Sequence, residues 1–497
     1  EVVSQGQSSK RRGKLATGKN ANMETEDRVE AAQKFLAGLK SKGKVAHIVR
    51  DMEMLSTAYI QLANWPVQEH SKETKPVPLP KTLQLTSIKD LKNVAVPSLE
   101  IKVDPSCTYD NIVWVVGFQP MFRLAGGVNL PKIITCCCSD GRDRRQLVKG
   151  RDDIRQDAIM QQVFSLVNEL LLRDPAASSR QLHIRTYKVV PLSRRSGLLE
   201  WCEGTQPIGE YLVGSPGTKG SGAHSRYRPK DWSFTECRRH MHTAANVSNA
   251  ETKYKVYMEA CQQFQPVFRF FFMENFPDPA HWFQRRLAYT HSVATNSIVG
   301  YILGLGDRHV MNILIDCATA ELIHIDLGIA FEQGHILPTP ETVPFRLTRD
   351  IVDGMGVTGV EGVFRRCCEK TMEVMRGNQE SLMTIVQVLL HDPLSEWTLS
   401  PQRAYALQGR RERRDCDTSD LNVSVAETEL DVEREKSGGN GPVNKLAERV
   451  LLRLRQKLQG LEDGVALSVA GQVNHLIQKS RDPHNLSKLY AGWQPYI

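Results

Sequence analysis

The 497-residue sequence lacks the long apolar run that would cross a membrane. Its longest apolar stretch, residues 298–305, is broken by glycines, whereas a spanning helix needs about 20 apolar residues. We therefore expect a soluble chain without a membrane partner. Because the sequence begins with Glu1 and has no apolar signal-peptide core, we also expect it to be a fragment of a longer protein.

The 11 cysteines include no CxxC pair, although three stand together at 136–138 and two at 367–368. Structural zinc sites need closely spaced Cys or His pairs, so the sequence offers no such site. An odd count without framework spacing excludes a disulfide scaffold and indicates reduced thiols in the cytosol or nucleus. We expect these thiols to be buried and inert rather than redox-active.

The net charge of +8 is too small for this length to indicate direct nucleic-acid binding. A basic cluster at residues 10–19 could form a nuclear-import or anion-binding patch, but a solvated loop is the simpler interpretation. The composition, 41% hydrophobic and 24% charged, is near the globular average and excludes a wholly disordered chain. Two lobes with flanking elements are expected for this length.

The amino-terminal half changes from helical to β-type patterning. Apolar spacing over 25–64 predicts two antiparallel helices, the end of a helical scaffold, and the Pro-rich stretch 72–81 reads as a boundary linker. A small antiparallel lobe follows, with strands expected at 99–103, 112–119, 132–138 and 144–149. A helix over 152–172 has one apolar stripe and should pack on that sheet.

The rest of the chain reads as mostly helical. We predict a strand at 183–191, an apolar segment at 197–202, a long buried helix at 281–303, a disordered or variable insert at 408–442, renewed helical spacing from 444, and a short helix at 472–479. Aromatic residues Tyr490, Trp493 and Tyr496 near the carboxyl end should dock on the folded body.

The most informative motif is Gly306-Asp307-Arg308-His309-Val310-Met311-Asn312, followed by a hairpin-like segment and Asp326-Leu327-Gly328. Protein kinases place an Asp five residues before an Asn and then a metal-binding Asp. Asp307 would orient an acceptor hydroxyl, while Asn312 and Asp326 would supply oxygen ligands to Mg²⁺. Each piece alone is a common surface or turn sequence, but their order and spacing together favour a catalytic centre.

His309 stands two residues after Asp307, where a protein kinase would not have it. It could donate to the γ-phosphate oxygens or share proton transfer with Asp307, and we favour stabilisation of the transferring phosphate. Arg308 could touch phosphate, although pairing with a neighbouring carboxylate is the favoured interpretation.

Two upstream segments offer phosphate contacts. The small residues Ala125, Gly126 and Gly127 lie between strands and would let backbone amides approach phosphates, but the loop matches neither a Walker A motif nor GxGxxG and could be a plain hairpin turn. Lys149 ends a strand, where an ammonium can neutralise the α- and β-phosphates, although many strand-end lysines are only solvated.

The residues after Lys149 include candidate partners for its ammonium group. Asp157, on the following helix, could orient Lys149, and Asp152 is the competing partner.

Several segments together resemble the phosphatidylinositol 3-kinase-related kinases. They are residues 122–132, 149–157, 306–312, 345–350 and 359–362. The resemblance runs from about residue 20 to 497, and only 408–442 clearly departs from it. It implies an α+β, bilobal protein-kinase-like fold of the phosphatidylinositol 3/4-kinase type, with a β-rich N-lobe and an α-rich C-lobe between helical FAT and FATC elements. ATP and Mg²⁺, with Mn²⁺ also accepted, are the implied cosubstrate and metal.

The implied domain boundaries are 1–85 for the end of the FAT domain and linker, 86–202 for the N-lobe and hinge, 203–407 for the C-lobe with its catalytic and activation loops, 408–464 for a partly disordered regulatory insert, and 465–497 for FATC. The resemblance makes Lys149 the phosphate-binding lysine and Tyr187 a pocket residue. The adenine-holding hinge would comprise Glu200, Trp201 and Cys202, with Thr205 beside it. Trp201 could instead be an ordinary core residue.

The choice of substrate depends on the activation segment. Residues 329–345 contain no Lys or Arg and two Glu, whereas an inositol polyphosphate headgroup would need cations there, so a protein substrate is favoured over a lipid. A catalytically silent scaffold is the third alternative, and the intact set of Lys149, Asp307, Asn312 and Asp326 argues against it. The tail at 490–497 either braces the activation segment or forms a plain structural cap.

The resemblance further implies a cellular role. It predicts phosphorylation of Ser/Thr-Gln sites in checkpoint and repair proteins, a homodimer recruited to DNA breaks through partner proteins, and a nuclear location with some protein in the cytoplasm.

Overall fold

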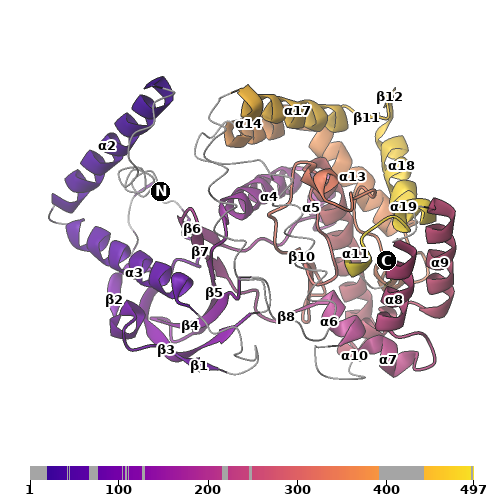
Figure 1. Ribbon diagram of the computed structural model, residues 1–497, viewed down its shortest axis with the longest axis horizontal. Coiled ribbons are helices and arrows are strands. Elements are labelled where there is room, and N and C mark those ends of the chain that lie inside the picture. The colour runs from indigo at the N-terminus through magenta and orange to yellow at the C-terminus, as the bar shows by residue number, and fades with distance from the viewer. Residues whose placement is uncertain are drawn as a thin grey trace.

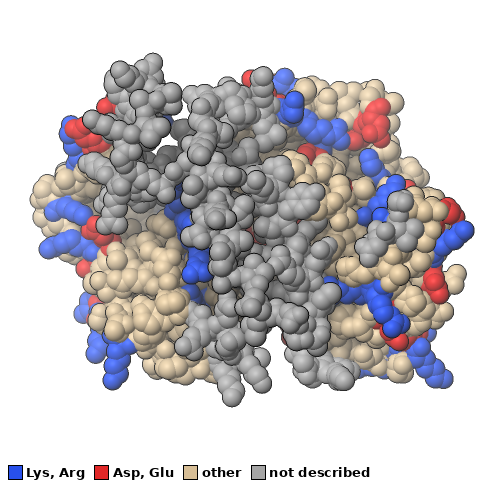
Figure 2. All heavy atoms as spheres, in the orientation of Figure 1, with Lys and Arg blue, Asp and Glu red and all other residues tan. Residues whose placement is uncertain are grey.

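The structure is a computed structural model that describes residues 19–41, 43, 45–66, 76–102, 105–106, 109, 111–125, 129–214, 222–245, 249–390, 441–493 and 496. Two lobes lie side by side, with the first helices beside the smaller lobe (Figure 1). Of the basic cluster at 10–19 only Lys19 is described, and of the predicted insert at 408–442 only residues 441–442, at the start of a helix; the rest of both lies outside the described residues. Figure 2 shows acidic and basic side chains interspersed on the visible described surface, consistent with the small net charge.

Both predicted amino-terminal helices are present, as α2 (Lys19–Ser41) and α3 (Ala46–Asn64). The buried face of α3 packs against strands β5 and β7 of the smaller lobe. The Tyr59 hydroxyl donates to Gln146 Oε1 at 2.6 Å, and Lys132 Nζ donates to the carbonyl oxygen of Ala63 at 2.8 Å. These contacts fix the carboxyl end of α3 on the sheet.

The smaller lobe is built on an antiparallel sheet of seven described strands in the order β1-β3-β4-β5-β7-β6, with β2 also paired to β3. Its strands are β1 (Val77–Pro78), β2 (Leu91–Ala95), β3 (Trp114–Leu124), β4 (Lys132–Cys138), β5 (Asp143–Gly150), β6 (Val189–Ser193) and β7 (Ser196–Glu200), and the short helix η1 (Gln84–Ser87) precedes β2. Strand β1 lies inside the predicted linker and pairs with β3. On β4, residues of alternating burial place Cys136 and Cys138 inside.

One strand prediction was wrong, and another was right only in part. Residues 99–102 form no strand, because the chain turns at Pro97 and the Leu99 amide donates to the carbonyl oxygen of Val96 at 3.0 Å; the strand lies earlier, at β2. The strand predicted at 183–191 is present only over its last three residues, because β6 begins at Val189 and residues 183–188 form no strand. The Asn168 side chain instead forms two hydrogen bonds with the backbone of Ile184: its Nδ2 donates to the carbonyl oxygen and its Oδ1 accepts the amide, each at 2.8 Å. These bonds take the place of pairing with a neighbouring strand.

Helix α4 (Arg155–Arg173) connects the two lobes. It contacts β6, but most of its buried stripe, including Val163 and Phe164, belongs to the core of the larger lobe rather than to the sheet. The expectation that this helix packs on the sheet therefore holds only at its edge.

The larger lobe is mainly helical. It contains α5 (Pro175–Ser179), α6 (Ile208–Val213), α7 (Ala223–Tyr227), α8 (Phe234–Ala245), α9 (Ala250–Gln263), α10 (Arg269–Asn275), α11 (Pro279–Ile302), η2 (Gln333–Ile336), α12 (Arg349–Gly354), α13 (Val363–Gly377), α14 (Gln379–Leu390) and α17 (Gly441–Leu458). A small antiparallel sheet of β8 (Thr205–Pro207), β9 (Ile313–Asp316) and β10 (Leu322–His324) holds the predicted hairpin.

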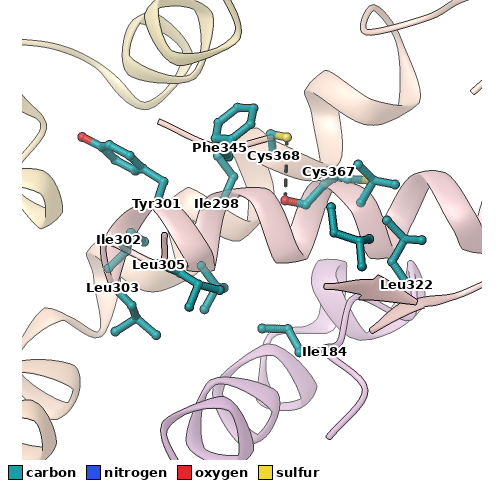
Figure 3. Packing of buried hydrophobic residues seen from close by; sticks show 14 of the residues in the cluster. Ile184, Ile298, Tyr301, Ile302, Leu303, Leu305, Leu322, Phe345, Cys367 and Cys368 are labelled. Carbon is teal, nitrogen blue, oxygen red and sulfur yellow. Dashed lines mark hydrogen bonds between the residues drawn. The ribbon is translucent and has the colours of Figure 1, made fainter. Parts of the chain in front are cut away.

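Helix α11 runs through the centre of the larger lobe, as its predicted apolar length requires. Its side chains pack against α13 on one side and against the β9–β10 hairpin on another (Figure 3). The Cys368 thiol lies 3.9 Å from the carbonyl oxygen of Ala294. Burial raises the pKa of Cys367 to about 11, so this thiol stays protonated at neutral pH. The nine described cysteines are all free thiols.

The carboxyl-terminal elements β11 (Leu461–Glu462), β12 (Val465–Ala466), α18 (Val469–Arg481), α19 (Pro483–Leu486) and η4 (Ala491–Trp493) pack on the larger lobe. The aromatic tail docks as predicted: Tyr490, Trp493 and Tyr496 form an apolar cluster with residues of α8 and α9. Among the described helices, we find none with the length and apolarity needed to span a bilayer.

Candidate active site

The predicted catalytic motif lies in the loop between α11 and β9. The Gly306 amide donates to the carbonyl oxygen of Ile329 at 2.9 Å, and the Glu332 amide donates to that of Gly304 at 3.2 Å. Gly304 has φ +61°, and a Cβ there would lie 2.4 Å from the Glu332 nitrogen. The start of the catalytic loop is therefore paired by backbone hydrogen bonds with the segment that follows Asp326.

Asp307 and Asn312 lie together, as their spacing predicts. The Asn312 Nδ2 group donates to the carbonyl oxygen of Asp307 at 3.1 Å and to its Oδ2 at 3.4 Å. Both residues are buried, and Asp307 has the left-handed φ of +58°. The Ile325 amide donates to the carbonyl oxygen of Asn312 at 3.1 Å, which ties this loop to the chain just before Asp326.

Asp326 also adopts a left-handed conformation, with φ +56°. The next residue, Leu327, donates its amide to Asp157 Oδ1 at 3.0 Å, and Gln156 Nε2 donates to the Leu327 carbonyl oxygen at 3.4 Å. The first turn of α4 therefore fixes the backbone around Asp326. Left-handed backbone at non-glycine residues is typical of functional sites whose geometry is imposed by their surroundings.

Arg308 corrects one sequence expectation, because within the described residues its guanidinium donates to carbonyl oxygens rather than to a carboxylate. Its guanidinium donates to Gly306 O at 2.7 Å, to Ile325 O at 2.8 Å and to Asp326 O. The side chain is 3% exposed, and burial lowers its pKa. Arg308 thus joins the catalytic loop to the strand end that presents Asp326.

Lys149 is the residue before the last of β5, and its ammonium group lies close enough to these acidic groups to feel their charge. Its Nζ lies 3.5 Å from Asp152 Oδ2, so the competing partner forms the described ion pair, whereas Asp157 accepts the Leu327 amide. Burial alone would lower the pKa of Lys149, but the charges of Asp326, Asp157 and Asp152 raise it. The ammonium is therefore charged in the site. Burial raises the pKa of Asp157 to about 6, against the opposing charge of Lys149.

His309 lies within the catalytic loop and is half-buried. Its Nδ1 accepts the Met311 amide at 3.2 Å, so the proton of the neutral ring resides on Nε2. The ring is thus set up as a hydrogen-bond donor through Nε2.

The predicted adenine-side residues lie where the two lobes join. Residues 201–204 connect β7 to β8, and Thr205 Oγ1 donates to the Cys202 carbonyl oxygen at 2.7 Å. Glu200 Oε2 accepts the Lys188 amide at 2.9 Å. Trp201 is half-buried, with the Arg145 guanidinium 5.3 Å from its ring centroid, so it is not a fully buried core residue.

Tyr187 supplies a test of whether this cleft fits a ligand. It is 6% exposed, and its buried hydroxyl has no hydrogen-bond partner among the residues that the structure describes. Burial raises its pKa, with added contributions from Asp157 and Cys202, so the hydroxyl is a neutral donor. An unpaired buried hydroxyl beside the hinge and Asp326 is consistent with a site built for a polar ligand.

Of the three residues predicted to approach the phosphates, the structure describes only Ala125. The Ala125 amide donates to the Pro131 carbonyl oxygen at 2.8 Å and so closes the loop after β3. Gly126 and Gly127 lie outside the described residues.

The donor set fits Mg²⁺ bound together with phosphates. Asp326 offers a carboxylate and Asn312 an amide oxygen, which are the hard ligands Mg²⁺ prefers in small number. We find no cluster of three or more His, Cys, Asp or Glu residues suited to a metal in the described parts of the chain.

Two features of the site were missed by sequence reasoning. Glu341, in the segment after Asp326, accepts the Asp307 amide at 2.6 Å. The Val310 amide donates to the Trp493 carbonyl oxygen at 3.3 Å, so the carboxyl-terminal tail contacts the catalytic loop itself. Contact between the carboxyl-terminal region and the activation segment was one of the two alternatives stated above, and α19 makes such a contact: Thr342 Oγ1 donates to the Asn485 carbonyl oxygen at 2.9 Å. No local motif announces these long-range contacts.

Comparison with known families matches residues 145–399 to the family described as phosphatidylinositol 3- and 4-kinase, and residues 466–497 to the FATC domain. The first match spans both lobes and contains Lys149, Asp307 and Asp326.

Similar proteins extend the match to most of the chain. It is 58% identical over 481 residues to the serine-protein kinase ATM of Sus scrofa, covering 97% of this chain and 15% of that protein. It is 48% identical over 458 residues to the serine/threonine-protein kinase ATM of Arabidopsis thaliana, covering 90% of this chain and 11% of that protein. The chain therefore spans about a sixth or less of these relatives.

A solved structure described as the complete CtTel1 dimer with C2 symmetry is similar to this chain, with a TM-score of 0.81 and 40% identity. The alignment covers 95% of this chain and 16% of that one. Together with the family match, this similarity confirms the two-lobed fold predicted from the sequence.

Proposed function

The chain belongs to the phosphatidylinositol 3- and 4-kinase family, and from this premise we propose that it is the catalytic portion of an ATP-dependent protein serine/threonine kinase. The observation that carries the proposal is the convergence of Lys149, Asp307, Asn312 and Asp326 at one junction between the lobes. The names of the similar proteins, which are serine or serine/threonine kinases, support the same conclusion.

The proposed reaction moves the γ-phosphoryl group of ATP to a hydroxyl. The acceptor oxygen forms a bond to the γ-phosphorus while the bond to the β-phosphate oxygen breaks and ADP leaves. Asp307 orients the hydroxyl and accepts its proton, and its hydrogen bond with Asn312 fixes the carboxylate direction. His309 donates from Nε2 to the transferring phosphate, because its Nδ1 is already an acceptor.

The ATP side of the proposed site uses charge and backbone. Lys149 binds the α- and β-phosphates, and its retained charge suits that role. Ala125, Gly126 and Gly127 would approach the phosphates, while Tyr187 lines the pocket. Backbone groups of Glu200, Trp201 and Cys202, with Thr205 beside them, would hold adenine.

Asn312 and Asp326 would hold Mg²⁺, or Mn²⁺ in its place. When bound, the metal neutralises charge on the β- and γ-phosphates. Arg308 keeps the two ligands in register by binding the carbonyl oxygens that flank Asp326.

A protein acceptor is favoured over a lipid by the charge of the activation segment. Residues 329–345 contain no Lys or Arg, and the acidic Glu332 and Glu341 lie among them. A phosphoinositide headgroup would meet no cation from this segment. A silent scaffold is disfavoured because the phosphate-binding, acceptor-orienting and metal-binding groups are all present.

The finer biological assignments remain part of this proposal. We infer Ser/Thr-Gln acceptor sites and a role in DNA-damage checkpoint and repair signalling from the similarity to ATM. The similar CtTel1 structure, described as a dimer, supports a homodimer. Recruitment to DNA breaks through partner proteins and a nuclear location, with some protein in the cytoplasm, follow from the same similarity.

The test measures transfer of radiolabel from ATP by the full-length protein with Mg²⁺ or Mn²⁺. A Ser-Gln peptide, the same peptide with Ala in place of Ser, and phosphoinositide vesicles are offered side by side. We expect label on the Ser-Gln peptide alone, abolished by Asp307→Ala and by Asp326→Ala. The exposed Glu361→Gln is the matched carboxylate control and should retain full activity. Label confined to the vesicles would establish a lipid kinase, and no variant-sensitive label would favour a scaffold.

A further inference from the structure

Glu341 lies in the activation segment, 34 residues after Asp307, and its side chain contacts the catalytic loop. Its Oε1 accepts the backbone amide of Asp307 at 2.6 Å, and the side chain is 8% exposed. We propose that Glu341 is a positioning residue that holds Asp307 in its working conformation and so couples the folded activation segment to the acceptor-orienting carboxylate. This inference rests on the proposed function.

The Asp307 backbone needs such a partner because its conformation is unfavourable for a residue with a side chain. Its φ of +58° lies in the left-handed region, which non-glycine residues occupy only when the surroundings impose it. The buried Asp307 amide donates to a side-chain carboxylate rather than to the backbone carbonyl oxygen of a helix or strand. The Glu341 carboxylate supplies the acceptor that the local backbone does not.

Two glycines make room for this carboxylate. A Cβ on Gly306 would lie 2.8 Å from Glu341 Oε2, and a Cβ on Gly334 would lie 2.4 Å from the same atom. One of these glycines precedes Asp307, and the other lies in the activation segment. The space around Oε2 is thus shaped from both segments that Glu341 connects.

The backbone of the activation segment carries the carboxylate to this position. The Glu341 amide donates to the Gly334 carbonyl oxygen at 3.2 Å, which closes residues 334–341 into a loop. The neighbouring Thr342 donates its hydroxyl to the carbonyl oxygen of Asn485 in α19. If this loop opens, the Asp307 amide loses the carboxylate that accepts its hydrogen bond. The residues proposed to bind ATP need not move for this to happen.

This arrangement predicts a specific kinetic signature. Within the described residues, Glu341 makes no hydrogen bond to Lys149 or Tyr187, which are predicted to bind ATP. Removing the Glu341 carboxylate should therefore lower kcat and leave the KM for ATP within about twofold. We expect Glu341→Ala to lower kcat by about 10- to 100-fold, the size of effect that small displacements of a reacting group produce. Glu341→Gln keeps an oxygen of the same reach and should recover most of the activity.

The experiment compares Glu341→Ala, Glu341→Gln and Glu341→Asp in the full-length protein, with Glu361→Gln as the surface control. Glu341→Asp keeps the charge but is one methylene shorter, so it should resemble Glu341→Ala; it also carries the test if the alanine variant does not fold. Binding of a non-hydrolysable ATP analogue establishes that the nucleotide site is intact in each variant.

A double-mutant cycle with Gly334→Ala sharpens the assignment. The added Cβ should displace the Glu341 carboxylate and lower kcat in the wild-type background, yet have much less effect when residue 341 is already alanine. Equal effects of Gly334→Ala in both backgrounds would show that the two residues act independently and would overturn the proposal.

Hydrogen exchange separates failure of this inference from failure of the proposed function. The amides of residues 303–312 should exchange faster in Glu341→Ala than in wild type, whether or not the protein transfers phosphate. Faster exchange with an inactive wild type would reject the proposed function and retain the structural role. Unchanged exchange, or a kcat of Glu341→Ala within twofold of an active wild type, would overturn the positioning role.

Discussion

Replacing Arg308 by lysine tests whether this arginine holds the active site together through carbonyl oxygens. The guanidinium joins Gly306, Ile325 and Asp326 with three hydrogen bonds in different directions. A lysine ammonium can reach at most one or two of these oxygens from a single point, so the fork geometry is lost. We expect Arg308→Lys to fold but to lose the fixed register between the catalytic loop and Asp326.

The structure sets the size of the effect. A hydrogen bond to a charged group contributes about 1.5–3 kcal/mol, and an unsatisfied buried carbonyl costs about 1–3 kcal/mol. Losing two of these three bonds should therefore weaken the local structure by about 3–6 kcal/mol. Arg308 joins the loop that carries Asp307 to the backbone of Asp326, and we call this set of hydrogen bonds the carbonyl clamp. A displacement of about 1 Å between the two aspartates should lower kcat about 100-fold.

The assay separates this role from direct phosphate binding. We would measure kcat, the KM for ATP and the Mg²⁺ dependence of Arg308→Lys in the full-length protein, with the exposed Arg366→Lys as control. A carbonyl clamp predicts a lower kcat and a higher Mg²⁺ requirement with little change in the KM for ATP. Activity of Arg308→Lys within twofold of wild type would refute the argument, and a rise in the KM for ATP alone would identify a phosphate ligand.

Three further perturbations follow from buried contacts. Gly150→Ala would place a Cβ 2.3 Å from the Ala63 carbonyl oxygen, so α3 should exchange its amide hydrogens faster. Trp493→Ala removes a buried ring under the Arg346 guanidinium and should destabilise the tail by about 3–5 kcal/mol, which limited proteolysis would detect. Burial raises the pKa of Glu341 from 4.5 to about 7 despite the hydrogen bond it accepts, so the native chain binds a proton that the unfolded chain releases between these values. Wild-type thermal stability should therefore fall relative to Glu341→Gln as the pH rises from 4.5 to 7, and parallel melting curves would contradict this assignment.

Regular helices were readily predicted because their signal is local. Apolar spacing alone located α11 and α18 to within a few residues. Strands were harder, since a short apolar run does not reveal its hydrogen-bond partner. The segment 183–188 was predicted as a strand, but its backbone pairs with the side chain of Asn168, a contact that no alternation of residues encodes.

The catalytic motif was also legible, because Asp307, Asn312 and Asp326 are close in sequence and their spacing is set by one loop and one hairpin. Glu341 is 34 residues from Asp307, and only the folded activation segment brings them together. The interpretation of Arg308 failed for a related reason. Arg308 binds carbonyl oxygens of Gly306, Ile325 and Asp326. The amino-acid sequence does not reveal which backbone carbonyl oxygens will be buried close to a given side chain.

The left-handed backbone conformations of Asp307 and Asp326 explain why the site depends on residues far away in the sequence. A left-handed backbone costs about 1–2 kcal/mol at a non-glycine residue, which is close to the net contribution of a single hydrogen bond. Asp307, at φ +58°, and Asp326, at φ +56°, can therefore each relax when one holding contact is lost. The contacts come from separate segments, namely Glu341 for Asp307 and Arg308 for Asp326. It follows that loosening either segment should impair catalysis well before it unfolds the lobe.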